Sequence, residues 1–109
     1  MATPNELYQM MTSQMNDLAQ QLFACIKRGE IERVAGMING VDITNLVSDE
    51  VSFHQNAMFF ACQIKDEDLS FRMVQLLQQN SNLKLSKSFD TLKQTPLYYA
   101  VKEGFSKVI

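Results

Sequence analysis

The sequence predicts an all-α fold, and three observations lead to that prediction. Apolar residues recur three or four positions apart from Leu7 to Ile26, which is the pattern of one apolar helix face. Residues 31–38 and 73–77 carry further apolar pairs at helical spacing. Hydrophobic residues make up 46% of the 109 residues and charged residues 20%, which is ordinary for a folded globular domain.

The first helix is expected to begin at residues 3–6, Thr-Pro-Asn-Glu. Thr3 can accept a hydrogen bond from the backbone N–H of Glu6, whose carboxylate can reach back, and Pro4 suits the first helical position. We interpret residues 1–20 as an N-terminal capping helix. Its methionine-rich apolar face suits an irregular packing surface, so this helix either caps the fold or binds a partner.

A family resemblance gives the fold a more specific form. Residues 95–100, Thr-Pro-Leu-Tyr-Tyr-Ala, resemble the Thr-Pro-Leu-His-x-Ala signature of the ankyrin repeat, and the usual glycine follows four positions later at Gly104. Asp90 stands five residues before the motif, where the family places the aspartate of its turn. The resemblance covers roughly residues 18–109 and implies an ankyrin-repeat solenoid. In such a solenoid, helix-turn-helix units stack side by side and hairpin loops join them.

Under this resemblance, residues 21–109 divide into two complete repeats and a truncated one, at about 21–50, 51–89 and 90–109. Cys25, Ala61 and Ala100 align as the small residue that ends the signature. The first two are 36 residues apart and the last two are 39 residues apart, against a family period of about 33. Each interval therefore carries a short insertion.

The second helix of each complete repeat should end in a turn that the family writes Gly-Ala-Asp-Val-Asn. Residues 40–44, Gly-Val-Asp-Ile-Thr, resemble this turn closely, and residues 80–84 resemble it more distantly. A residue at the end of a helix often takes a positive φ, which glycine and asparagine tolerate. The apolar side chains of Ile43 and Leu83 are then expected to pack back under the helices.

The middle repeat is longer than the first between these landmarks. We expect its extra residues at 65–70, where they would lengthen the loop between its two helices. Three adjacent carboxylates stand there, at Asp66, Glu67 and Asp68. They lack the alternating spacing, the glycine and the distant glutamate of a calcium loop, so we interpret them as part of a solvated loop.

The chain departs from the family pattern at several positions. His54 and Lys93 stand where the family usually has a turn glycine, and Lys65 replaces the glycine that follows the first helix. Phe59 and Tyr98 replace the histidine that usually bonds neighbouring backbone. Aromatic packing is expected to take the place of that bond.

The sequence predicts no catalytic, cofactor-binding or metal site, and no small-molecule substrate. The single histidine, His54, cannot complete a His–Cys metal site of usual spacing and is expected in an exposed turn. The four glycines are scattered singly, so no phosphate-binding loop is present. Cys25 and Cys62 fall in apolar segments and are interpreted as core residues. The net charge of −2 gives no sign of nucleic-acid binding.

The cellular compartment of the protein is predicted from the absence of a membrane span, a secretion signal and a disulfide scaffold in the sequence. No apolar run approaches the ~20 residues of a membrane span, and no secretion signal is visible at the start. Two cysteines are too few for a disulfide scaffold, which favours a reducing compartment, cytoplasmic or nuclear. Helical spacing has just begun at residues 105–109 without a stop signal, so we expect an N-terminal fragment of a longer chain.

The resemblance also implies a partner-binding surface, because ankyrin proteins bind through their hairpin loops and the inner helices that line a concave face. This mapping selects twelve residues: Lys27, Arg28, Ser52, Phe53, Gln55, Gln63, Ile64, Thr91, Leu92, Gln94, Lys102 and Glu103. Phe53 and Leu92 occupy the same place in successive loops. They form either the apolar centre of an interface or a local core under the next loop.

The expected function is therefore recognition of another protein by a rigid scaffold, without activity in this segment. An alternative is a regulatory or substrate-recruiting ankyrin arm of a larger enzyme, such as a protein methyltransferase, kinase, acyltransferase or ubiquitin ligase. A third interpretation is a helical repeat or bundle of another kind, which would require an extra helix within the 39-residue interval.

Overall fold

The regular elements are helices throughout the described part of the chain. The computed structural model describes residues 17–49 and 53–108. Residues 17–27 are helical, and four helices follow: α2 (Ile31–Ile38), α3 (Ala57–Cys62), α4 (Glu67–Asn80) and α5 (Pro96–Glu103). The prediction of an all-α fold is confirmed for these residues. Most of the predicted capping helix, residues 1–16, lies outside them.

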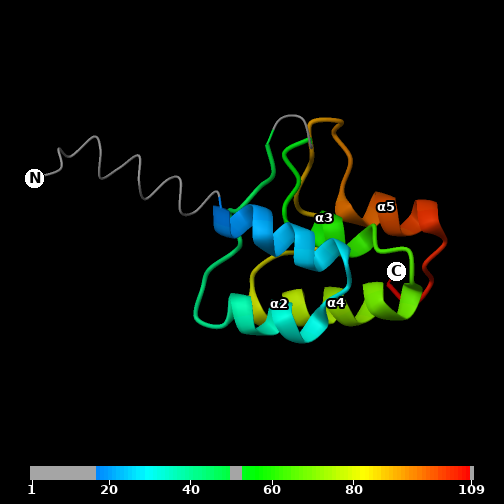
Figure 1. Cartoon of the computed structure of the whole chain (residues 1–109). Helices are drawn as coiled ribbons and strands as arrows, with labels where there is room; N and C mark the ends of the chain where they lie inside the picture. The colour runs from blue at the N-terminus through cyan, green and yellow to red at the C-terminus, as the bar shows by residue number, and fades with distance from the viewer. Residues whose placement is uncertain (1–16, 50–52, 109) are drawn as a thin grey trace, which may run out of the picture.

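The helices form two layers, as Figure 1 shows. The helix at 17–27, α3 and α5 lie in one row, and α2 and α4 lie in a second row beneath them. Helix α3 packs against both α4 and α5, and α2 packs against α4. The chain crosses between the rows through loops, two of which project side by side above α3 and α5.

The first helix pair follows the apolar pattern of its sequence. Residues 17–27 continue without a break through positions 20 and 21, where the capping helix was expected to meet the first repeat. Leu22 and Ile26 are fully buried on this helix, as are Val34 and Ile38 on α2. The chain then turns back, and Ile43 is buried under the helices as the sequence predicted.

Helices α3 and α5 begin with side-chain caps that the sequence specifies. Asn56 accepts a hydrogen bond from the backbone N–H of Met58 at 3.0 Å, and Thr95 accepts one from Tyr98 at 3.3 Å. Such caps satisfy backbone donors that have no partner within the helix. Pro96 occupies the first turn of α5, and Gly104, with a φ of 75°, ends it. Residues 95–104 therefore form a short helix with a side-chain cap at its start and a left-handed glycine at its end.

The predicted loop at 65–70 is wrong, because those residues begin a long helix. Helix α4 spans 14 residues against eight in α2, and only residues 63–66 connect it to α3. Asp66 caps it by accepting from the N–H of Leu69 at 3.1 Å. Glu67 and Asp68 lie in the first turn, where carboxylates interact favourably with the helix dipole. The acidic run is therefore the start of a helix. The described 39-residue interval from Ala61 to Ala100 contains the long helix α4 and no extra helix.

The two rows are held together by a continuous apolar core. Cys25, Ala61 and Ala100, the three aligned small residues, are all buried in it, as is Leu83. Cys25 and Cys62 are free and buried, as predicted. The hydroxyl of Ser70 on α4 donates to the carbonyl of Ala61 at 2.7 Å inside this core. In the described ranges, no helix is both long enough and apolar enough to cross a membrane.

Two glycines with the same backbone conformation provide a test of this packing. Gly29 has a φ of 72°, and a Cβ placed there would lie 3.1 Å from Cδ1 of Leu69 on α4. Gly104 has a φ of 75°, and a Cβ there would meet nothing within 4 Å. Gly104→Ala should lower the free energy of unfolding by about 1 kcal/mol, because alanine disfavours positive φ.

Gly29→Ala should lower the free energy of unfolding by about 1 kcal/mol more than Gly104→Ala does, because the added methyl group also crowds Leu69. Urea unfolding followed by circular dichroism measures both variants. Equal losses would mean that Leu69 moves aside and that the contact between the first and second helix pairs is not tight at this point.

Candidate functional site

The two projecting loops are closed and joined by backbone hydrogen bonds. In the first loop, the N–H of Ser48 donates to the carbonyl of Gln55 at 2.8 Å. In the second loop, the N–H of Asp90 donates to the carbonyl of Gln94 at 3.0 Å. The N–H of Thr91 donates to the carbonyl of Phe53 at 2.8 Å, which links the two loops at their outer ends.

Three non-glycine residues at these loops adopt left-handed backbone conformations. Phe53, His54 and Lys93 have φ values of 65°, 51° and 61°. His54 and Lys93 are the positions where the sequence comparison expected a turn glycine, and each is exposed. Each left-handed residue with a side chain costs roughly 1–2 kcal/mol, so the surrounding hydrogen bonds must enforce these turns.

A buried carboxylate, Asp90, holds the loops against α5. One oxygen of its side chain accepts from the hydroxyl of Tyr99 at 2.5 Å and from the amide nitrogen of Gln55 at 2.9 Å. The other accepts from the backbone N–H of Gln94 at 3.0 Å. Gln63 on the α3 side donates to Gln55 at 2.9 Å and extends the network. This Asp90 network connects both loops with the ends of two inner helices.

The ionisation of this network follows from its geometry. Burial of Asp90 acts to raise its pKa, but hydrogen bonds from Tyr99, Gln94, Gln55 and Leu92 act in the opposite direction and leave the pKa below its ordinary value. Burial, together with the hydrogen bond to the Asp90 carboxylate, raises the pKa of Tyr99. At neutral pH the pair is therefore an ionised carboxylate with a neutral phenol that donates to it.

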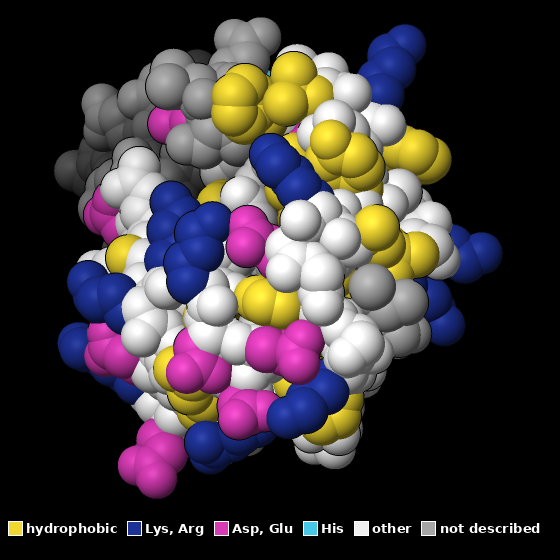
Figure 2. Space-filling model, turned by 90° about the vertical axis from the view of Figure 1, so that its right-hand side faces the viewer, with side chains coloured by type: hydrophobic (Ala, Val, Ile, Leu, Met, Phe, Trp, Pro, Cys, Tyr) yellow, Lys and Arg dark blue, Asp and Glu magenta, His cyan; other side chains and the backbone are white. Residues whose placement is uncertain are grey.

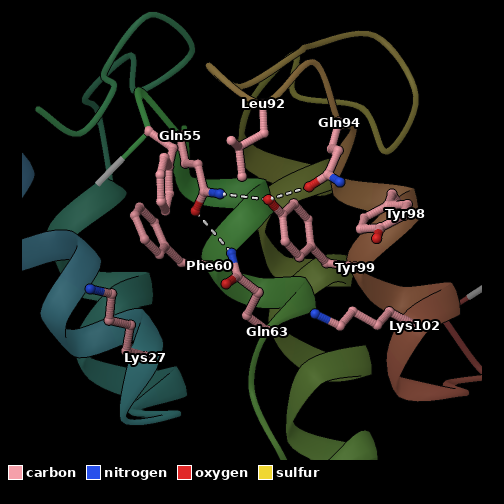
Figure 3. Close-up of a pocket in the computed structure, with 10 residues that line it drawn as sticks. Lys27, Gln55, Phe60, Gln63, Leu92, Gln94, Tyr98, Tyr99 and Lys102 are labelled. Carbon is pink, nitrogen blue, oxygen red and sulfur yellow. Dashed lines mark hydrogen bonds between the residues drawn. The ribbon is translucent and has the colours of Figure 1, made fainter. Parts of the chain in front are cut away.

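A groove of about 650 Å³ lies beside this network, between the loops and the inner helices. Figure 3 shows Tyr99 near its centre and Leu92 at its upper edge, on the side of the loops, with Lys27 and Lys102 on opposite sides. Phe53, Leu92 and Tyr98 line it with exposed fractions of 42%, 52% and 43%. Three large apolar side chains are thus exposed around one concavity.

Seven of the twelve residues selected from the sequence line this groove. They are Lys27, Phe53, Gln55, Gln63, Leu92, Gln94 and Lys102. Gln55 is nearly buried, so its part is to hold the loops rather than to offer a free side chain. Phe53 and Leu92 do not close a local core, because both remain exposed.

The other five residues have different positions. Ile64 is buried in the core, so its selection as a surface residue was wrong: α3 ends at Cys62 and the chain turns inward. Glu103 forms an ion pair with Lys65 at 2.8 Å outside the groove. Arg28 pairs with Glu30 and lines a separate hollow. Thr91 is exposed, and its backbone links the loops. Ser52 lies outside the described residues.

Three aromatic residues of the groove were missing from the selection: Phe60, Tyr98 and Tyr99. Phe60 and Tyr99 hold the same place in α3 and α5, directly before the aligned alanine. That equivalence was readable from the sequence. Tyr98 was noted there only as a replacement for histidine. Phe59, its counterpart in α3, is buried and packs edge-on against Tyr99 with ring centroids 5.9 Å apart, which confirms the expected aromatic packing.

A second hollow of about 470 Å³ adjoins the groove on the side of the helix at 17–27. The two concavities share Lys27 and Phe60. The ammonium group of Lys27 lies 4.7 Å from the centre of the Phe60 ring, within the range of a cation–π contact. Asp49 and His54 of the first loop also line this hollow.

No group of three or more potential metal ligands is present within residues 17–49 and 53–108. No family model matches the chain, and neither a curated protein nor a solved structure was found to be similar to it. The features available for a functional assignment are therefore those of the groove itself.

The lowered pKa of Asp90 leads to a pH-dependent prediction. A carboxylate with a lowered pKa in the folded protein contributes stability above its unfolded pKa of about 4, and this contribution is lost as the pH falls through its folded pKa. Asp90→Asn should therefore lower the free energy of unfolding by about 2 kcal/mol at pH 7, because charge-assisted hydrogen bonds are weakened.

The difference between wild type and Asp90→Asn should shrink when the same unfolding experiment is done near pH 2.5. Asp42→Asn is a matched comparison: Asp42 is exposed, and its hydrogen bonds from Thr44 also lower its pKa, so its loss should fall with pH in the same direction but be smaller than that of Asp90→Asn. A gap between wild type and Asp90→Asn that is independent of pH would contradict the ionised state of Asp90.

Proposed function

We propose that this chain is a protein–protein interaction module with an ankyrin-type solenoid fold. The observation that carries the functional proposal is the groove, in which side chains from three helices and two loops converge on one concave, partly apolar surface. The fold proposal is supported by the two rows of helices and by the Thr-Pro-Leu motif. That motif caps and begins α5, which ends at a left-handed glycine.

The proposed mechanism is recognition by a surface that is already ordered. The Asp90 network joins the loops to α3 and α5, so the side chains at the rim are held by bonds that exist before a partner arrives. A preorganised surface loses less conformational entropy on binding than a flexible one. The exposed Phe53 and Leu92 are the apolar anchors of this surface, and the loop conformation fixes their position.

We further propose that the module works in a reducing compartment, the cytosol or the nucleus. Its two cysteines are free and buried in the core. Burial raises the pKa of the Cys62 thiol to about 12, which makes it unreactive at neutral pH.

The functional proposal predicts a partner that depends on the rim of the groove. Wild-type protein and the double variant Phe53→Ser/Leu92→Ser are immobilised and exposed to extract of the source cells. The variant should lose a specific partner, because truncation of apolar anchors at the centre of an interface costs about 2 kcal/mol or more each.

A matched control is Phe89→Ser/Val101→Ser. These residues are an aromatic and an aliphatic side chain, 66% and 55% exposed, and neither lines the groove. The control should retain the partner, and circular dichroism should show that all three proteins are folded. A partner that is retained by the groove variant and lost by the control would move the binding surface away from the groove.

A further inference from the structure

The groove carries positive charge although the chain as a whole carries a net charge of −2. Among residues 17–49 and 53–108, its charged lining residues are Lys27 and Lys102, and none of these described residues places an exposed carboxylate in its lining. The nearest buried carboxylate, Asp90, is 5% exposed and already accepts hydrogen bonds from Tyr99, Gln55 and backbone N–H groups. A ligand in the groove therefore meets two ammonium groups and no opposing negative surface.

Both lysines are available to a ligand. The ion pairs among the described residues use Arg28, Arg33, Lys65 and Lys107 as their cations, and neither Lys27 nor Lys102 takes part. Glu103, which follows Lys102 in sequence, is paired with Lys65 instead. The contact of Lys27 with the Phe60 ring holds its ammonium group at the edge of the groove without neutralising it.

The surface between the two lysines is apolar, with amide groups beside it. Tyr99 lies between them in Figure 3 and Leu92 lies above it, toward the loops. Phe53, Phe60 and Tyr98 also contribute to the apolar lining. Gln63 donates through its amide nitrogen to Gln55 and to the carbonyl of Phe59, which leaves its own carbonyl oxygen as an acceptor. An extended backbone offers N–H donors of the kind that such an acceptor can bind.

The side chains around the groove differ in charge. Asp49 lines the adjoining hollow, which shares Lys27 and Phe60 with the groove. Figure 2 shows the end of the molecule that carries α5: hydrophobic side chains gather in its upper part, on the side of the loops, and acidic side chains lie mostly below them. The acidic side chains that this view shows thus lie mostly apart from the hydrophobic side chains near the loops.

We propose that the groove binds a short, extended acidic segment of a partner protein. An apolar or aromatic side chain of the segment packs against Phe53, Leu92 and Tyr98, and flanking carboxylates pair with Lys27 and Lys102. This inference rests on the proposed function and specifies its ligand. Two isolated lysines, without an arginine in the lining, are a poor match for the continuous phosphates of a nucleic acid.

The test uses peptide display against the full chain. Random 12-residue peptides on phage are selected on wild-type protein. The recovered peptides are then synthesised, and their dissociation constants are measured by fluorescence anisotropy. Peptides with several aspartates or glutamates around an aliphatic or aromatic residue should be enriched. Each lysine removed should weaken their binding by about fivefold, and Lys27→Glu/Lys102→Glu should weaken it by tenfold or more.

The control variant Lys84→Glu/Lys87→Glu has the same change in net charge at two exposed lysines outside the groove, and should leave binding within about twofold. Binding should also weaken with increasing salt, and a single-stranded oligonucleotide of 12 thymidines should not compete. Equal losses in both charge-reversal variants would show a general effect of net charge and overturn the assignment to these lysines.

Two outcomes separate this inference from the proposed function. Neutral or basic peptides that bind wild type and are lost in Phe53→Ser/Leu92→Ser would overturn the acidic ligand but keep the groove as a binding surface. Acidic peptides whose binding survives that double variant would overturn both proposals. Recovery of no peptide, or stronger binding of the oligonucleotide than of any peptide, would overturn the inference of an acidic peptide ligand.

Discussion

The carboxylate of Asp90 places one negative charge where two loops and an inner helix meet. A charge in such a position is stable only when donors surround it, and here Tyr99, Gln55 and backbone N–H groups supply them. Gln94 and Tyr99 follow Asp90 within nine residues, whereas Gln55 lies 35 residues away in the first loop, so the charge ties the first loop to the second loop and α5. The shape of the groove follows from that arrangement.

The floor of the groove is hydrogen-bonded within the protein, and its rim exposes apolar side chains. At the floor, polar groups such as the amides of Gln55 and Gln63 are bonded within the protein. At the rim, Phe53 and Leu92 are exposed on loops that hydrogen bonds hold in left-handed turns. A partner would therefore gain from covering the rim without having to break the floor. In many interfaces, a few apolar side chains likewise supply most of the binding energy, while the groups around them contribute little.

The helix layers tolerate unequal lengths without losing their contacts. Helix α4 is almost twice as long as α2, yet both pack in the same row. The buried hydroxyl of Ser70 bonds the carbonyl of Ala61 and fixes α4 against α3. The additional residues extend the helix along its own axis, where they leave the spacing between neighbouring helices unchanged. The interval between aligned residues can therefore vary while the stacked arrangement is kept.

Local chemistry in the sequence determined where most helices begin and end, because caps and apolar spacing act over a few residues. Thr95, Pro96 and Gly104 specify α5, and the apolar positions of 31–38 specify α2. The start of α4 differs from the loop that the ankyrin spacing predicts, because Asp66 caps the helix by accepting from the N–H of Leu69. The burial of Ile64 and the bonds of Gln55 to Asp90 and Tyr99 became clear from the three-dimensional fold alone. Gln55 lies 35 and 44 residues from these two partners, and no local pattern encodes contacts over such a separation.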